Sequence, residues 1–247
     1  MKLDLSENKE FGRSITFYER YVKRPLDFFC ALVAIIVLSP VMLVIALLVR
    51  IKLGSPVIFK QKRPGLNEKI FTMYKFRTMT DEKDENGKLL PDDVRLTKFG
   101  DMLRHTSLDE LPELVNILKG DLATCGPRAQ LVRDMTFMND EQRKRHLVRP
   151  GLTGLAQTNG RNALDWEEKL KLDLVYIKKI TFMGDLKILL DTVMQVIFHK
   201  KGLEDGKTDE IEITDDYGDY LLKKGLVSTA EYSKKQEEAR KLIEGVE

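Results

Sequence analysis

The sequence contains little cysteine and histidine and has no glycine-rich phosphate loop. Its two cysteines, Cys30 and Cys125, stand far apart, and its three histidines share no metal-ligand spacing. These absences argue against a disulfide-stapled secreted domain, a zinc site with the usual ligand spacing, and a nucleotide site of the Walker or Rossmann type. We expect a reducing, cytosolic environment and no catalytic histidine.

Net charge is also nearly absent, because 41 lysines and arginines face 39 aspartates and glutamates. The charges are unevenly placed, however, since residues 199–247 contain 9 basic and 13 acidic residues. The body of the protein is therefore basic and its tail acidic.

One segment has no charge at all. Residues 28–49 form an apolar run of 22 residues, which as a helix would extend about 33 Å and could cross a hydrocarbon core of about 30 Å. The run ends at Arg50-Ile51-Lys52 and not at small residues, so a cleaved signal peptide is a poor interpretation. The sequence predicts a membrane-attached protein.

Ser39 and Pro40 lie in the middle of this run, where proline removes a backbone hydrogen bond and favours a kink or a reversal of the helix. Residues 1–27 and the first twenty residues after the run carry six basic residues each, so the positive-inside rule favours neither flank. Two alternatives stay open from these residues alone, a re-entrant hairpin and a kinked single span.

Beyond the apolar run, the sequence predicts a mainly α fold with a small β-hairpin, an α+β class. Residues 57–59 and 69–76 are β-branched and aromatic and are separated by Pro64-Gly65, a hairpin pattern. Residues 164–180 and 186–198 have the periodicity of amphipathic helices. We expect a membrane segment at 1–55, a catalytic core at 56–200 and an acidic helical tail at 201–247.

The tail has its own helix signals. Residues 220–224 read as a short helix stopped by Gly225, and Ser228 to Glu231 form a capping box that opens a second helix to about Glu244. We expect a separate unit, either an interaction element or a plain polar tail.

Asp109 and Glu110 are the densest chemical candidates. Ser107-x-x-Glu110 is also a capping-box pattern, which would make Glu110 a purely structural residue. Pro112 argues against this, because a helix beginning near Asp109 would place the proline in its first turn, where it costs little. The two carboxylates would then lie ionised at a helix N-terminus, as a nucleophile or as metal ligands.

In the sequence around this pair, most of the basic residues are arginines. Residues 101–161 contain seven arginines and two lysines, a bias that suits bidentate recognition of phosphate or carboxylate. Arg128 and Arg161 lie in turn sequences, where ligand contacts are common, whereas Arg143 and Arg145 read as a solvated helix face. Lys75-Phe76-Arg77 ends the hairpin and could add to the same clamp.

Six motifs occur in a fixed order between about residues 20 and 200. They are Lys23-Arg24-x-x-Asp27 before the apolar run with Ser39-Pro40, Lys75-Phe76-Arg77-Thr78-Met79, Ser107-Leu108-Asp109-Glu110-Leu111-Pro112, Lys119-Gly120-Asp121, Gly126-Pro127-Arg128, and Arg149-Pro150-Gly151-Leu152-Thr153-Gly154. In this order the chain resembles the monotopic phosphoglycosyl transferases of the bacterial sugar transferase family.

The resemblance implies transfer of a sugar 1-phosphate from a UDP-sugar to polyprenyl (undecaprenyl) phosphate with release of UMP, the first step of a surface glycan. It implies a re-entrant helix broken at Ser39-Pro40, Asp109 as nucleophile, and Mg²⁺ held near Asp109 and Glu110. By the same resemblance, the phosphate and nucleotide region would include Lys75, Arg77, Arg104, Arg128, Arg161 and Asp185. The implied location is the bacterial inner membrane, with the core facing the cytosol, membrane lipid around the helix, no nucleic-acid partner, and a possible homo-oligomer.

Two residues depart from the family pattern. Ala129 stands where a second proline often follows Gly-Pro-Arg, and Glu113 stands where a neutral glutamine is common, which makes it a poor added metal ligand. A membrane-anchored Mg²⁺-dependent phosphohydrolase and a noncatalytic module that binds anionic lipid are the rival functions.

Overall fold

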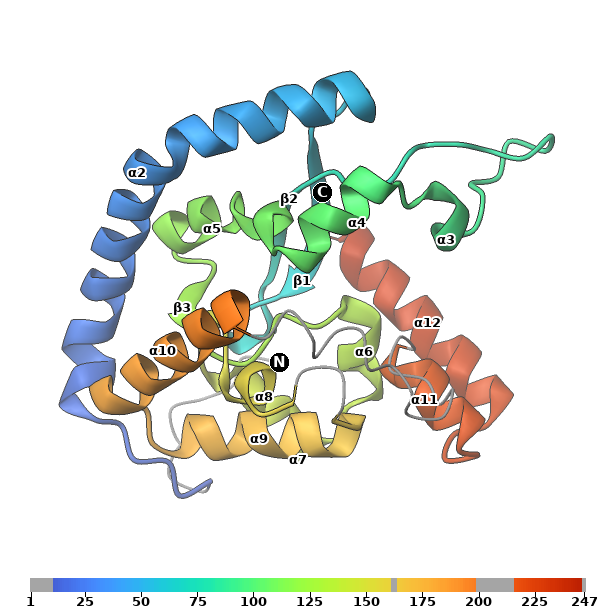
Figure 1. Ribbon diagram of the computed structural model, residues 1–247. Coiled ribbons are helices and arrows are strands. Elements are labelled where there is room, and N and C mark those ends of the chain that lie inside the picture. Colours follow the sequence, from blue (N-terminus) through green and yellow to red (C-terminus); the bar gives the residue numbers. More distant parts are fainter. Residues whose placement is uncertain (1–10, 161–163, 199–215, 246–247) are drawn as a thin grey trace.

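The computed structural model describes residues 11–160, 164–198 and 216–245. The described residues are 61% helical, with a small antiparallel hairpin and one long apolar helix near the N-terminus, so the predicted class is confirmed at that level. Figure 1 shows the apolar helix along the outside of a body of shorter helices.

The apolar helix, α2 (Lys23–Lys52), continues directly from a short π-helical turn, η1 (Tyr18–Val22). Among the described residues, the segment Tyr18–Lys52 is the one helix long and apolar enough to cross a membrane. Its outer face is exposed and apolar, with Phe29, Val33, Ile36, Val37, Leu43, Val44, Leu47 and Ile51. This face is suited to lipid.

The inner face of α2 lies against the body along most of its length. Near the start, Ala31 packs against Leu114 and Ile117, and near the end Val49 packs in a cluster with Phe76. Figure 1 shows that α2 changes direction about midway, so that it wraps around the body.

The expected break at Ser39 and Pro40 is a bend within a continuous helix. Pro40 has no N–H to donate to the Ile36 carbonyl four residues earlier, and the Ser39 hydroxyl donates to that same carbonyl at 2.8 Å. The serine therefore replaces the hydrogen bond that proline removes, and helical structure continues through the pair.

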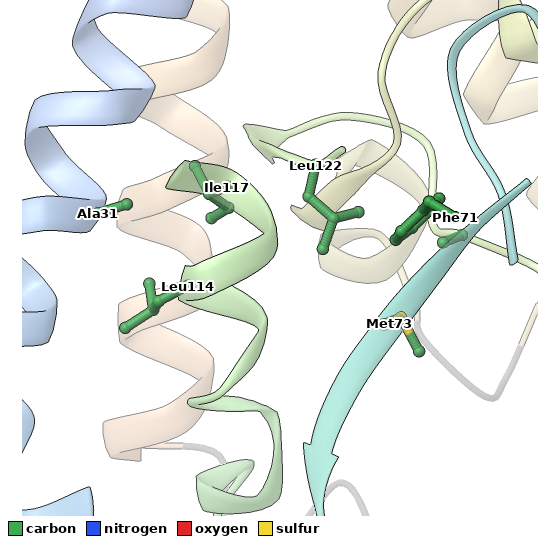
Figure 2. Close-up of a cluster of buried hydrophobic side chains, with 7 residues drawn as sticks. Ala31, Phe71, Met73, Leu114, Ile117 and Leu122 are labelled. Atoms are coloured by element: carbon green, nitrogen blue, oxygen red, sulfur yellow. The ribbon is translucent and has the colours of Figure 1, made fainter. Parts of the chain in front are cut away.

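The predicted hairpin is confirmed. Strand β1 (Ile58–Pro64) pairs antiparallel with β2 (Ile70–Phe76), and η2 (Leu66–Glu68) lies between them. Asn116 fixes a helix onto the hairpin, because its amide donates to the Thr72 carbonyl at 2.7 Å and accepts from the Tyr74 N–H at 3.1 Å. Figure 2 shows Phe71 and Met73 of β2 close to Leu122, with the helix that carries Leu114 and Ile117 between them and Ala31 of α2.

The remaining elements complete the body. In chain order they are α3 (Asp92–Arg95), α4 (Lys98–His105), η3 (Leu108–Glu110), α5 (Glu113–Lys119), β3 (Ala123–Cys125), α6 (Val132–Phe137), α7 (Asp140–Arg143), η4 (Lys144–Leu147), β4 (Gly151–Thr153), α8 (Leu155–Thr158), α9 (Trp166–Lys178) and α10 (Phe182–Phe198). Strands β3 and β4 form a parallel pair. A Cβ at Gly154 would lie 2.1 Å from the Gly126 carbonyl oxygen, so this close approach requires glycine.

The tail helices are α11 (Tyr217–Lys223) and α12 (Thr229–Glu244), close to the predicted bounds. As predicted, the Ser228 hydroxyl caps α12 by accepting from the Glu231 N–H at 3.2 Å. The tail is not separate, however, since the Tyr217 N–H donates to Asp134 at 2.9 Å and the Thr136 hydroxyl donates to the Lys235 carbonyl. Residues 216–245 therefore belong to the folded body (Figure 1).

Candidate active site

A cavity of about 670 Å³ lies between α2, α5, α8, α9 and α10. One part of its wall is apolar and begins at the membrane helix, with Ala34, Leu38, Leu111, Leu114, Leu152, Ala156 and Leu189. Another part is charged, with Arg63, Arg104, Glu110, Arg128, Asp134, Lys169, Asp173 and Asp216. The cavity thus joins an apolar surface beside α2 to a wall that carries four cationic and four anionic side chains.

The turn before α5 sets the position of Glu110. Ser107 has a left-handed backbone (φ 55°) and its side chain makes no capping bond, so the capping-box alternative is wrong. Asp109 and Glu110 lie in the single turn η3, and α5 begins only at Glu113, later than the predicted start near Asp109. Pro112 immediately precedes α5, where its missing N–H is not needed.

Lys75 at the end of β2 binds the two glutamates of this region. Its ammonium lies 2.7 Å from Glu110 and 3.2 Å from Glu113, and Arg128 lies 3.2 Å from the same oxygen of Glu110. Burial alone would raise the pKa of Glu110, but Arg128 and Lys75 outweigh it and lower the pKa to about 2. The carboxyl group of Glu110 is therefore ionised at neutral pH.

Asp109 is in a different environment from its neighbour. It is 8% exposed, and burial raises its pKa although Lys75 opposes the shift. Ser107 and Glu110 on either side of it line the cavity, whereas Asp109 is not one of the lining residues. Two adjacent carboxylates thus differ in basicity, and Asp109 is the more basic.

Of three other predicted site residues, one lines the cavity, one does not, and one lies outside the described residues. Arg104 lines the cavity and donates to the Thr78 hydroxyl at 3.0 Å. Arg77 is turned away from the cavity wall, with its guanidinium donating to the carbonyls of Met79 and Ser55. Arg161 lies outside the described residues.

Asp185 lies in a separate buried cluster behind β3. Its carboxylate is 2.5 Å from the Lys23 ammonium and accepts from the Tyr18 and Tyr176 hydroxyls at 2.9 and 2.8 Å. This cluster fixes the start of α2 to α9 and α10. The structure therefore does not bring Asp185 into the cavity with Glu110 and Arg128.

The prediction that Arg143 and Arg145 form a solvated face is wrong. Arg145 is 2% exposed, makes a buried ion pair with Asp173, and donates to the Arg128 carbonyl at 2.6 Å. Arg143 makes two hydrogen bonds to Glu68. Arg145 thereby holds the Gly-Pro-Arg turn that presents Arg128.

Carboxylate oxygens suit Mg²⁺, which proteins often bind through one or two carboxylates together with substrate phosphates. Among the residues that the structure describes, no group of three or more potential ligands gathers into a metal cage. The donor chemistry of the two adjacent carboxylates, Asp109 and Glu110, fits Mg²⁺, whose remaining ligands would have to come from outside the described residues. Glu113 is paired with the Lys75 ammonium at 3.2 Å.

Sequence reasoning did not find several cavity residues. Arg63 on β1 lines the wall, as do Lys169 of α9 and the glutamines Gln130, Gln157 and Gln195. Burial lowers the pKa of Arg63 to about 10, which leaves it cationic at neutral pH. Its place in a lysine-rich strand gave no signal that set it apart from its neighbours.

A comparison with known protein families tests the resemblance that the motif order suggests. The sequence model of the family described as bacterial sugar transferase matches residues 18–199, which include α2, η3 and the Gly-Pro-Arg turn. The chain belongs to the bacterial sugar transferase family. The predicted family and the predicted class of enzyme, a sugar-phosphate transferase, are confirmed.

Individual members of the family are similar over the same region. An uncharacterized sugar transferase, EpsL, of Bacillus subtilis (strain 168) is 52% identical over 71% of this chain and 87% of its own length. The exopolysaccharide production protein PSS of Rhizobium leguminosarum bv. phaseoli is 38% identical over 73% of this chain and 98% of its own length.

A third relative carries a named activity. The UDP-glucose:undecaprenyl-phosphate glucose-1-phosphate transferase of Escherichia coli (strain K12) is 38% identical over 73% of this chain, and the match spans 41% of that protein. The family match ends at residue 199, so α11 and α12 lie beyond the matched region.

Proposed function

We propose that this chain transfers a sugar 1-phosphate from a UDP-sugar to undecaprenyl phosphate and releases UMP. The observation that carries the proposal is the cavity itself, which connects Ala34 and Leu38 of the membrane helix to Glu110 and Arg128. A polyprenyl phosphate has the same two-part character, an apolar chain and an anionic head. The names of relatives with glucose, galactose and N-acetylgalactosamine activities support the general reaction.

The proposed topology is a re-entrant α2 in the inner membrane with the core on the cytosolic side. Support comes from both flanks of the helix, which bond to the same body. The Ser14 N–H donates to the Lys178 carbonyl at 2.9 Å, and the Ser55 carbonyl accepts from Arg77 at 2.8 Å. A straight span would instead place its two ends on opposite sides of a core of about 30 Å.

In the proposed first step, a carboxylate oxygen of Asp109 attacks the sugar-bearing phosphorus of the UDP-sugar. The new oxygen–phosphorus bond forms as the bond to UMP breaks, and UMP leaves with the bonding electron pair. Burial makes Asp109 a more basic carboxylate than Glu110, which favours it as the nucleophile. For this step the Asp109 side chain would have to face the cavity, which it does not line in this structure.

In the proposed second step, an oxygen of the acceptor phosphate attacks the same phosphorus and releases the Asp109 carboxylate. The acceptor is already anionic at neutral pH, so no strong general base is needed. Mg²⁺ held at Asp109 and Glu110 would reduce the repulsion between carboxylate and diphosphate. Arg104 and Arg128 would neutralise phosphate oxygens, while Lys75 keeps Glu110 ionised and in place.

Arg161 remains a proposed phosphate ligand. For Arg77 and Asp185, the contacts support a positioning role, because both side chains have polar partners away from the cavity. A homo-oligomer remains an expectation from the sequence.

UMP release with and without undecaprenyl phosphate tests the function. With Mg²⁺, a UDP-sugar and no lipid, the enzyme should release about one equivalent of UMP and then stop, and added lipid should restore turnover. Continuous UMP release without lipid would instead support the phosphohydrolase. Loss of all UMP release in Asp109→Asn would separate both enzymes from a noncatalytic lipid-binding module.

A further inference from the structure

Two glutamines of the cavity wall have unused hydrogen-bond acceptors. Gln157 of α8 and Gln195 of α10 both line the cavity, and the side-chain oxygen of each is buried without a partner among the described residues. A buried amide oxygen without a donor costs free energy, and no residue in the described part of the chain supplies a donor to either oxygen.

The orientation of each amide is fixed by its other end. The Gln157 side-chain nitrogen donates to the Leu152 carbonyl at 3.2 Å, and the Gln195 nitrogen donates to the Thr158 carbonyl at 2.7 Å. Turning either amide over would set its oxygen against a carbonyl oxygen. The nitrogens are therefore bound to backbone carbonyls, and the two buried oxygens have no donor among the described residues.

In contrast to the two glutamine oxygens, the neighbouring threonine hydroxyls have hydrogen-bond partners. The hydroxyls of Thr153 and Thr192 lie 2.7 Å apart, and Thr192 also donates to the Ile188 carbonyl at 2.7 Å. Leu152, Ala156 and Leu189, from the same elements as the two glutamines or next to them, add apolar groups to the wall. Two acceptors in such a wall select a ligand that carries hydrogen-bond donors.

Among the proposed substrates, the polyprenyl chain has no donors and ionised phosphates accept hydrogen bonds. Hydroxyl groups belong to the donor substrate, on its sugar and on its ribose. We propose that Gln157 and Gln195 accept hydrogen bonds from hydroxyls of the UDP-sugar and thereby discriminate among donor substrates. This inference rests on the proposed function and adds specificity residues to the same cavity.

The experiment measures discrimination and not activity alone. The Kd of the preferred UDP-sugar, and of analogues lacking one sugar hydroxyl each, is measured by calorimetry with Mg²⁺ in an Asp109→Asn background, where transfer is blocked. A second arm compares UMP with its 2′-deoxy and 3′-deoxy forms. Each arm is repeated with Gln157→Met, Gln195→Met and the control Gln236→Met, whose residue lies on α12 outside the cavity wall.

Without a substitution at the glutamines, removal of the recognised hydroxyl should weaken binding about tenfold. In the matching glutamine variant, that ratio should fall to about one, while Gln236→Met keeps it. The first arm responds if the hydroxyl belongs to the sugar, and the second responds if it belongs to the ribose. A purely structural role would weaken all ligands equally and leave every ratio unchanged.

Unchanged ratios in both glutamine variants, or binding that never depends on a sugar or ribose hydroxyl, would overturn the inference. The oxygens would then be satisfied by water alone. Absence of any UDP-sugar binding would overturn the proposed function as well, whereas binding with unchanged ratios would overturn this inference alone.

Discussion

The Lys75 ammonium lies 2.7 Å from Glu110, so the end of the hairpin is bonded to the turn that precedes α5. The same ammonium also serves Glu113, which is 4% exposed. The Lys75 ammonium therefore pairs with two carboxylates, that of Glu113 and that of Glu110, which it shares with Arg128, so its removal should affect both.

Lys75→Met should destabilise the fold in a pH-dependent way. Removing one partner of a buried ion pair typically costs about 3–5 kcal/mol of unfolding free energy. Burial already raises the pKa of Glu113, and without Lys75 the folded-state pKa values of both glutamates should rise. A carboxylate with a raised folded-state pKa binds its proton more tightly in the folded protein than in the unfolded chain. It therefore costs little folding stability at low pH, and its cost grows as the pH rises above its pKa in the unfolded chain. The loss of stability in Lys75→Met should thus be largest near pH 7.5 and smaller near pH 5.

Urea unfolding in detergent at the two pH values measures this difference. Lys60→Met is a matched control, because Lys60 is exposed on β1. An equal loss of stability at both pH values would show that the glutamates are not held ionised by Lys75.

Arg128→Lys should reduce turnover by about ten- to a hundredfold while leaving folding and membrane attachment intact. The substitution keeps the charge but removes the planar fork that binds a phosphate through two hydrogen bonds. Initial rates of UMP release measure the effect, with Arg240→Lys on the exposed side of α12 as the control. Near wild-type turnover would mean that the contact is absent or purely Coulombic.

The topology proposal predicts the labelling of two single cysteines. Ser14→Cys and Ser55→Cys lie at exposed positions on opposite flanks of α2, in a background without Cys30 and Cys125. Both should react with a membrane-impermeant thiol reagent only from the cytosolic side. Reaction of either one from the periplasm would contradict a re-entrant helix.

Gly218→Ala should loosen the tail from the body. A Cβ at this position would lie 2.5 Å from the ring of Phe137, so either this ring or α11 would have to shift. Overpacking of this kind costs about 1–3 kcal/mol, more than alanine returns through helix propensity. Limited proteolysis should cut α11 and α12 faster than in the control Ser233→Ala, and an unchanged cleavage rate would show that the tail is not held by this contact.

The sequence predicted the elements whose signals are local. The hairpin of β1 and β2 follows from residue type and Pro64-Gly65, and the start of α12 follows from Ser228. The docking of the tail was not predictable, because it depends on a contact between Tyr217 and Asp134, which are distant in sequence.

The candidate site was also predictable only where its residues belong to local sequence motifs. Glu110, Arg104 and Arg128 carried motif signals and meet in the cavity. Arg145 read as a charged surface residue, because its partner Asp173 is contributed by another helix and only the fold brings the two together. Ser39 and Pro40 predicted a kink or a reversal of the helix. The path of α2 around the body depends in addition on its packing against α5 and β2.

The most direct test of the account is the mass of the peptide that contains Asp109. The full-length enzyme is incubated with Mg²⁺ and a UDP-sugar without lipid, quenched, digested and analysed by mass spectrometry. The account predicts that this peptide gains the mass of one phosphosugar, that Asp109→Asn gains none, and that undecaprenyl phosphate removes the adduct. No adduct, together with UMP release that requires the lipid, would contradict the covalent mechanism and indicate direct transfer between the two bound substrates.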